Sequence, residues 1–188
     1  FFENSTRTRI SFELAQKRLS ADTVNFSASS SSLKKGESFK DTVQNIEAMK
    51  IDAVVMRHPD AGASLHLTKY VDAVVINAGD GTHEHPTQAI LDMTSLQERF
   101  GKLKGLRIGI VGDIAHSRVA RSNIYGLKKL GADVILCGPT TLIPPYIDSL
   151  GVRVTHDLDE VLDWADAINV LRIQLERMDR GLFPSVRE

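Results

Sequence analysis

The chain has 188 residues, a formal net charge of −1 and a single cysteine, Cys137. Because 23 Lys and Arg residues are balanced by 24 Asp and Glu residues, the chain lacks the basic excess that nonspecific nucleic-acid binding requires. One cysteine excludes an internal disulfide framework and suits a reducing compartment such as the cytoplasm. The apolar runs, among them Ile51–Met56, are too short to span a bilayer, and no secretion signal is visible.

Short runs rich in Val, Ile and Ala alternate with amphipathic stretches along the chain. The runs show little polar alternation, which is typical of parallel strands that are covered on both faces. In chain order, the expected elements are helix 5–19, strand 22–26, helix 38–49, strand 52–57, helix 61–69, strand 73–77, helix 86–100, strand 107–112, helix 117–130, strand 133–137, helix 144–149, strand 153–155, helix 158–164 and strand 167–171. This order predicts an α/β protein with doubly wound parallel sheets and right-handed crossovers.

A domain boundary is expected at the start of the long helix 86–100. We therefore predict two doubly wound lobes, residues 1–86 and residues 87–188, with a cleft between them. Because the chain opens on Phe1 and stops at Glu188 without a closing element, we expect it to be truncated at both ends. Open α/β sheets bind ligands at the carboxyl ends of their strands, so the loops that follow the strands are where chemistry is expected.

The first candidate site is the helix start that reads Asn4–Ser5–Thr6–Arg7–Thr8–Arg9. Asn4 or Ser5 is a suitable N-cap, which places the next three residues in the first helical turn. The unpaired N–H groups and the dipole of that turn favour phosphate, and the hydroxyl and guanidinium groups there add donors. A capped helix with exposed arginines is the alternative. Two arginines oppose the dipole preference for acidic residues, and such a local conflict is typical of functional sites.

Two further clusters in the first half follow predicted strands. Arg57 ends strand 52–57, where a guanidinium can bind phosphate or carboxylate through two N–H groups, and a solvated loop arginine is the alternative. Pro86 fits the first helical position, so His85 and Gln88 can face one ligand. We expect a neutral His85 to polarise a carbonyl and Gln88 to contact an amide. The pair of His83 and His85 also permits a metal site, but the sequence lacks the further ligands of a zinc motif.

In the second half, Gly109–Gly112 and the helix start after it resemble a dinucleotide-binding loop, but the third glycine is missing, so no NAD is expected. Arg118, at the opening of helix 117–130, can bind a carboxylate. Arg172 and Gln174 alternate with apolar residues, so they project the same way from an extended segment, and a polar strand edge is the alternative. The segment 27–36 reads SASSSSLKKG, which is compatible with a linker or with an anion-binding loop.

Taken together, these motifs resemble the aspartate/ornithine carbamoyltransferase family. FENSTRTR, KKGES, the strand-end arginine, HPTQ, VGDIAHSRVARS and LRIQLER occur here in the order found in that family. LKKGES and LRIQLER resemble the aspartate branch rather than the ornithine branch. The resemblance implies transfer of the carbamoyl group from carbamoyl phosphate to the amine of L-aspartate, a step of de novo pyrimidine biosynthesis. It implies no metal or organic cofactor. An ornithine-type enzyme and a non-catalytic anion-binding fragment remain as alternatives.

The same resemblance implies roles for individual residues. Thr8, Arg57 and His85 are implied as the catalytic groups around the carbonyl oxygen. The implied carbamoyl-phosphate ligands are Ser5, Thr6, Arg7, Thr8, Arg57, His85, Gln88, Ser31 and Lys35, and the implied aspartate ligands are Lys35, Arg118, Arg172 and Gln174. Members of the family form homotrimers with shared active sites, so Ser31 and Lys35 are expected to come from the neighbouring subunit. A regulatory chain or a dihydroorotase is a further partner that the family allows.

Overall fold

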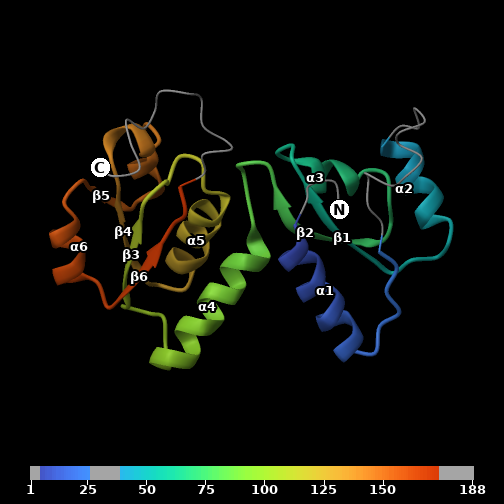
Figure 1. The fold of residues 1–188 in the computed structure, drawn as a ribbon, viewed down its shortest axis with the longest axis horizontal. Coiled ribbons are helices and arrows are strands. Elements are labelled where there is room, and N and C mark those ends of the chain that lie inside the picture. Colours follow the sequence, from blue (N-terminus) through green and yellow to red (C-terminus); the bar gives the residue numbers. More distant parts are fainter. Residues whose placement is uncertain (1–4, 26–38, 174–188) are drawn as a thin grey trace. The chain divides into compact units, whose positions relative to one another are not determined.

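The computed structural model describes residues 5–25 and 39–173 of the chain (Figure 1). The chain divides into two compact units, Phe1–Thr87 and Gln88–Glu188, called unit 1 and unit 2 below. Each unit contains a parallel sheet, which confirms the predicted α/β class. No helix among the described residues is long and apolar enough to cross a membrane.

Unit 1 is built on a pair of parallel strands, β1 (Ala53–His58) and β2 (Val74–Asp80). Its described helices are α1 (Thr6–Arg18), α2 (Phe39–Glu47) and α3 (Ala63–Leu67). A small apolar core joins α2, α3 and the sheet, and it is formed by Val43, Met56, Leu67 and Val71. The pairing shifts between Met56 and His58, where one residue of β1, Arg57, lies opposite two of β2, Ala78 and Gly79. Such an irregularity re-aims the side chain beside it, which here is that of Arg57.

Unit 2 contains four parallel strands in the order β5-β4-β3-β6. Helix α4 (Pro86–Phe100) leads into it, and the elements that follow are β3 (Arg107–Val111), α5 (Arg118–Lys129), β4 (Asp133–Cys137), β5 (Arg153–Thr155), α6 (Leu158–Trp164) and β6 (Ala167–Val170). The chain leaves β3 toward β4 and β5, and then returns to place β6 on the other side of β3. The strand order therefore reverses between β3 and β6.

Both faces of this sheet are covered, which explains its continuous apolar strands. On one face, Ile108 and Ile110 of β3 belong to a core cluster that includes Ile124 and Leu127 of α5. On the other face, Ile135 and Cys137 of β4 pack with Val161 of α6. Figure 1 shows α5 and α6 on opposite sides of the four strands. Burial raises the pKa of the Cys137 thiol, with smaller contributions from the charges of Asp157 and Glu160.

Three sequence predictions are wrong in their details. Residues 22–25 form no strand, and Val24 is 92% exposed, because no described strand lies beside them to complete the hydrogen bonds. The predicted helix 144–149 is reduced to a 3₁₀ turn at Ile147–Leu150, since consecutive prolines at 144 and 145 lack N–H donors and disfavour helical backbone before them. Helix α3 begins only at Ala63, because Gly62 before it adopts a left-handed conformation with φ 79°.

Candidate active site

The first turn of α1 brings hydroxyl groups together at its N-terminus. Ser5 occupies the N-cap position, but its side chain does not cap a backbone N–H. Its hydroxyl instead donates to Thr8 Oγ1, 2.8 Å away. Thr6 and Arg7, between these two residues, have exposed side chains. The N-terminal N–H groups of α1 therefore keep the anion-binding character that a side-chain cap would reduce.

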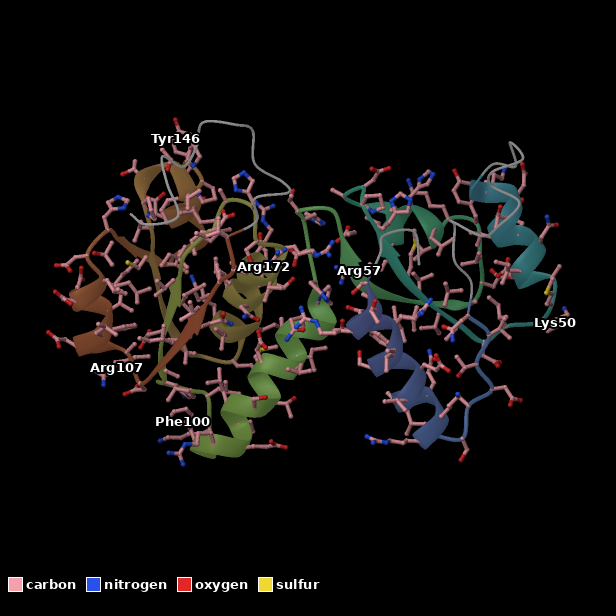
Figure 2. The ribbon with its side chains drawn as sticks, viewed as in Figure 1. Lys50, Arg57, Phe100, Arg107, Tyr146 and Arg172 are labelled. Atoms are coloured by element: carbon pink, nitrogen blue, oxygen red, sulfur yellow. The ribbon has the colours of Figure 1, made fainter. Side chains whose placement is uncertain are left out.

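Arg57 links this helix to the sheet of unit 1. Its Nη1 donates to Thr8 Oγ1 at 3.1 Å and to the carbonyl oxygen of Ala78 at 3.4 Å. The same nitrogen lies 3.4 Å from Nε2 of His85. Figure 2 marks Arg57 on β1. The structure thus brings Thr8, Arg57 and His85 together, although they come from a helix, a strand and a loop.

His85 is held on both sides of its ring and is only 8% exposed. Nδ1 lies 3.3 Å from Thr87 Oγ1, and Nε2 faces the guanidinium of Arg57. A guanidinium group only donates, so in this arrangement Nε2 accepts and the ring proton is on Nδ1. The Thr87 hydroxyl can also donate, and it would then favour the other tautomer, in which Nε2 carries the proton. Sequence reasoning did not identify Thr87.

Asp80 organises the loop before His85. Its carboxylate is 2% exposed and accepts hydrogen bonds from Gly62 N (2.7 Å), Asn77 Nδ2 (3.0 Å) and Glu84 N (3.1 Å). Burial favours the neutral carboxyl, but the hydrogen bonds, including one with His83, outweigh it and hold the pKa of Asp80 below its ordinary value. Local sequence does not reveal this role of Asp80, because the donor on Gly62 is remote in the chain.

Gly81 closes the same loop against the turn that follows β1. Its N–H donates to the carbonyl oxygen of His58, and its φ is +55°. A Cβ at this position would lie 2.8 Å from the carbonyl oxygen of Pro59. The turn that carries Asp80 therefore requires glycine here, both for the backbone conformation and for space.

Gln88 lies on the opening turn of α4, as its distance from Pro86 predicts. Its Nε2 donates to Asp92 Oδ1 at 2.9 Å. Asp92 also accepts from Asn123 Nδ2 of α5 at 2.8 Å and from Asn169 Nδ2 of β6 at 3.4 Å. Sequence reasoning missed Asp92, although its position four residues after Gln88 on a helix is a signal that the two side chains can meet.

In unit 2, the remaining described candidates follow the two strands between which the strand order reverses. Arg118 begins α5 after β3, and Arg172 follows β6 (Figure 2). Open α/β sheets bind ligands outside the carboxyl ends of strands at such a reversal. The two loops are close, since a Cβ on Gly112 would lie 2.9 Å from the carbonyl oxygen of Leu171. Arg118 is 3% exposed, whereas the side chain of Arg172 is exposed.

A short hydrogen-bonded turn sets where α5 begins. The buried carboxylate of Asp113 accepts from the backbone N–H of His116 at 3.1 Å and lies 2.8 Å from His116 Nδ1. Ser117 then caps the helix, because its Oγ accepts from Ala120 N at 3.1 Å. Arg118 is therefore the first residue of a well-defined helix rather than part of an irregular loop.

Three of the predicted site residues, Ser31, Lys35 and Gln174, lie outside the described residues. Among the residues that the structure describes, no group of three or more His, Cys, Asp and Glu side chains is arranged to hold a metal ion. His83, which the sequence offered as a metal ligand with His85, instead places Nδ1 3.2 Å from Asp80 Oδ2. The described donors are therefore mainly cationic, hydroxyl and amide groups, which suit anionic ligands.

A parallel sheet with guanidinium, imidazole and hydroxyl groups at strand ends is typical of an enzyme for small phosphorylated or carboxylated substrates. Residues 1–98 match the family model described as "Aspartate/ornithine carbamoyltransferase, carbamoyl-P binding domain". This match covers more than half of the chain, which therefore belongs to the aspartate/ornithine carbamoyltransferase family. The family resemblance that the motifs predicted is confirmed.

Curated relatives are similar over the whole chain. The aspartate carbamoyltransferase catalytic subunits of Christiangramia forsetii and Cytophaga hutchinsonii are 63% and 62% identical over 188 residues, which is 100% of this chain and 61% of each relative. The chain thus spans about three fifths of the length of these relatives.

Solved structures agree with these relatives. Aspartate transcarbamoylase from Trypanosoma cruzi, in complex with aspartate and phosphate, superposes with a TM-score of 0.86 at 35% identity over 95% of this chain and 61% of that chain. The catalytic subunit of the M. jannaschii enzyme gives 0.81 at 37% identity over 94% of this chain and 60% of that chain.

Proposed function

We propose that the protein containing this chain transfers the carbamoyl group of carbamoyl phosphate to the amine of L-aspartate. The observation that carries the proposal is the contact of Arg57 Nη1 with both Thr8 Oγ1 (3.1 Å) and His85 Nε2 (3.4 Å). Membership of the family and relatives named as aspartate carbamoyltransferase catalytic subunits support it.

Carbamoyl phosphate binds at the start of α1 and beside Arg57 in this proposal. The phosphate accepts from the N-terminal N–H groups of α1, from the hydroxyl of Thr6 and from Arg7, while Ser5 keeps its hydroxyl proton on Thr8 Oγ1. Thr8 Oγ1 already accepts from Ser5 and from Arg57, which occupies both of its lone pairs and leaves its own O–H to donate. Thr8 and Arg57 can therefore both donate to the carbonyl oxygen of the substrate.

The reaction is a displacement at the carbamoyl carbon. The amine nitrogen of aspartate forms a bond to this carbon, negative charge builds on the carbonyl oxygen, and the bond from carbon to the bridging phosphate oxygen then breaks. Phosphate leaves with the bonding electrons and takes the proton that the amine loses, so the products are N-carbamoyl-L-aspartate and phosphate. When the carbonyl oxygen of the substrate replaces His85 Nε2 as an acceptor of Arg57, the Thr87 hydroxyl donates to Nδ1 and Nε2 carries the ring proton. Thr8, Arg57 and His85 then all donate to the charged oxygen, which is usually the largest catalytic contribution in such reactions. Fixing both substrates side by side supplies the rest.

Aspartate is held by Arg118 and Arg172, with Gln174 and Lys35 completing the set in this proposal. Two guanidinium groups suit a dicarboxylate, because each can bind one carboxylate through paired N–H groups. The side-chain cation of ornithine would be repelled by Arg172. The two arginines therefore favour aspartate over ornithine as the acceptor.

A steady-state assay with carbamoyl phosphate and either amine tests this function. We expect carbamoyl aspartate to form and carbamoyl ornithine to form much more slowly. Faster carbamoylation of ornithine would reassign the acceptor. A protein that binds inorganic phosphate or carbamoyl phosphate but carbamoylates neither amine would be a non-catalytic anion-binding protein, and the proposed transfer would be wrong.

The finer architecture that we propose has two doubly wound lobes, residues 1–86 for carbamoyl phosphate and residues 87–188 for aspartate, in a homotrimer where Ser31 and Lys35 act in the neighbouring subunit's site. Mixing two inactive variants tests whether neighbouring subunits share one active site. Arg57→Ala and Lys35→Ala chains, refolded or coexpressed together, should regain activity, because some sites then combine an intact Arg57 with an intact Lys35. Activity that never rises above that of either variant alone would assign both residues to one chain's own site.

A further inference from the structure

Three amide groups from three different elements donate to the carboxylate of Asp92. Gln88 Nε2, one turn earlier on α4, donates to Oδ1 at 2.9 Å. Asn123 Nδ2 of α5 donates to Oδ2 at 2.8 Å, and Asn169 Nδ2 of β6 approaches the same oxygen at 3.4 Å. No basic side chain of residues 5–25 and 39–173 forms an ion pair with Asp92. The carboxylate is thus an acceptor for neutral amides.

This arrangement determines which way each amide points. A carboxylate accepts hydrogen bonds and does not donate, so only the NH₂ end of each amide can face Asp92. Asn123 shows the constraint clearly. It is 1% exposed, and its Oδ1 is buried without a hydrogen-bond partner among the described residues, yet its NH₂ still points to Asp92. For Gln88, the same constraint leaves Oε1 as the acceptor that faces away from Asp92.

We propose that Asp92 is a positioning residue that holds the amide of Gln88 with Oε1 presented as an acceptor, and so selects a carbamoyl group over an acyl group. This inference rests on the proposed function, in which Gln88 contacts the carbamoyl NH₂. A carbamoyl group carries N–H donors beside its carbonyl, whereas an acetyl group has a methyl group in the same place. Only the carbamoyl group can donate to an outward-facing Oε1.

The two carboxylate oxygens separate this role from simple packing. Among the described residues, Oδ1 accepts only from Gln88, whereas Oδ2 accepts from Asn123 and Asn169. Substitution of Asn169 by Ala removes a contact on Oδ2 and leaves Oδ1 to orient Gln88. A packing role therefore predicts similar effects from Asn169→Ala and from Asp92→Asn, and a positioning role predicts different effects on donor selectivity.

The test compares carbamoyl phosphate with acetyl phosphate as donors to aspartate, in the full-length protein that contains this chain. In Asp92→Asn, the new side chain must still accept from Asn123 and Asn169, so its NH₂ faces Gln88. Gln88 then turns to accept with Oε1 and presents its own NH₂ toward the carbamoyl NH₂, donor against donor. We expect the ratio of kcat/KM for carbamoyl phosphate to kcat/KM for acetyl phosphate to fall by about tenfold. The value for acetyl phosphate itself should change little.

Several variants control this measurement. Glu98→Gln neutralises an exposed carboxylate on the same helix and should leave the ratio unchanged. Gln88→Ala should lower the ratio by itself, and adding Asp92→Asn to it should lower the ratio no further.

The pair Gln88→Glu/Asp92→Asn restores the hydrogen bond with donor and acceptor exchanged and keeps an oxygen toward the substrate. It should recover the ratio relative to Asp92→Asn, and because both donors carry the same phosphate, the added charge cancels in the ratio.

The experiment distinguishes a failure of the proposed function from a failure of this inference about Asp92. Failure of the wild-type protein to carbamoylate aspartate would overturn the proposed function and this inference with it. An active wild-type protein in which Gln88→Ala lowers the ratio but Asp92→Asn does not would overturn this inference alone. Should Asp92→Asn not fold, the exchanged pair carries the test, and a ratio in that pair as low as in Gln88→Ala would count against positioning by Asp92.

Discussion

Arg57 Nη1 lies 3.1 Å from Thr8 Oγ1, although 49 residues separate the two in the chain. Ser5 Oγ donates to the same oxygen at 2.8 Å. With both lone pairs of Thr8 Oγ1 occupied, the hydroxyl proton is directed away from Ser5 and Arg57. Arg57 therefore does two things in the proposed site: it supplies its own N–H donors, and it makes Thr8 a donor rather than an acceptor.

Arg57→Lys should lower kcat/KM by about 10²- to 10³-fold, because an ammonium group cannot reproduce the planar set of N–H donors that contacts Thr8 and Ala78. Steady-state kinetics with carbamoyl phosphate and aspartate measures this loss. Binding of inorganic phosphate, followed by calorimetry, should change less, since the N-terminus of α1 remains. Arg18→Lys, at the exposed end of α1, is the matched control and should keep full activity. A value for Arg57→Lys within about threefold of wild type would remove Arg57 from the catalytic groups.

His85→Ala should retain measurable turnover. In the proposed reaction, phosphate takes the proton of the amine, so His85 is one of three donors to the carbonyl oxygen and its loss should cost about 10²- to 10³-fold in kcat. Thr87→Val removes only the hydroxyl 3.3 Å from His85 Nδ1 and should give a smaller loss in the same assay. Complete loss of turnover in His85→Ala, with carbamoyl phosphate still bound, would instead make His85 the essential base.

The pattern of residues predicted most of the fold because most helices and strands are marked by residues within or next to them in the chain. The bounds of α4 and α6 are those expected, since Pro86 and Asp157 mark the helix starts. Strand β4 was found from a buried apolar run that a two-sided parallel sheet requires. The predicted strand 22–26 contains β-branched Thr23 and Val24, but the structure places no strand beside residues 22–25. Composition alone does not say whether a neighbouring strand exists.

The candidate site was predictable only in part, for a related reason. Arg57 stands at a strand end and His85 before a helix, and both positions can be read from local sequence. Asp80 was not identified, because its main-chain donor at Gly62 lies 18 residues earlier and is brought close only by the fold. Asn169 lies 77 residues from Asp92, and no local rule connects them. The proposed substrate-binding groups lie at positions that local sequence marks, while the groups that orient them depend on tertiary contacts.

Asp80→Asn should loosen the loop that leads to His85, in a manner that depends on pH. Because the pKa of Asp80 is lower in the folded protein, its carboxylate stabilises the fold above the ordinary aspartate pKa of about 3.9 and loses this effect as the pH falls through the folded value. An amide at this position cannot accept from all of the donors, so the cost at pH 7 should be about 1–3 kcal/mol.

Amide hydrogen exchange at Gly62 and Glu84, whose N–H groups donate to Asp80, measures this effect locally. Both amides should exchange faster in Asp80→Asn at pH 7, and the difference from wild type should shrink below about pH 4. Asp60→Asn, with a side chain that is 82% exposed, should leave both amides protected. Equal protection in Asp80→Asn and wild type at pH 7 would show that the carboxylate does not hold the loop.

Gly109→Ala should destabilise unit 2, because Gly109 lies where β3 meets α6. An added Cβ would lie 2.5 Å from Val161 Cγ1. Val161 is fully buried and β-branched, so it keeps one rotamer in the helix and α6 must move instead. We expect a loss of about 1–3 kcal/mol in the free energy of unfolding, measured by urea denaturation with the fluorescence of Trp164 on α6.

Gly126→Ala on α5 is the matched comparison for this prediction. Its added Cβ would lie 2.6 Å from Met93 Sδ, a similar overlap, but the sulfur belongs to a long side chain with three rotatable bonds that can move aside. Replacing glycine within a helix also gains up to about 1 kcal/mol. Gly126→Ala should therefore be neutral or stabilising. If Gly109→Ala proved as stable as Gly126→Ala, the close packing of α6 on β3 would not depend on the absence of a side chain at residue 109.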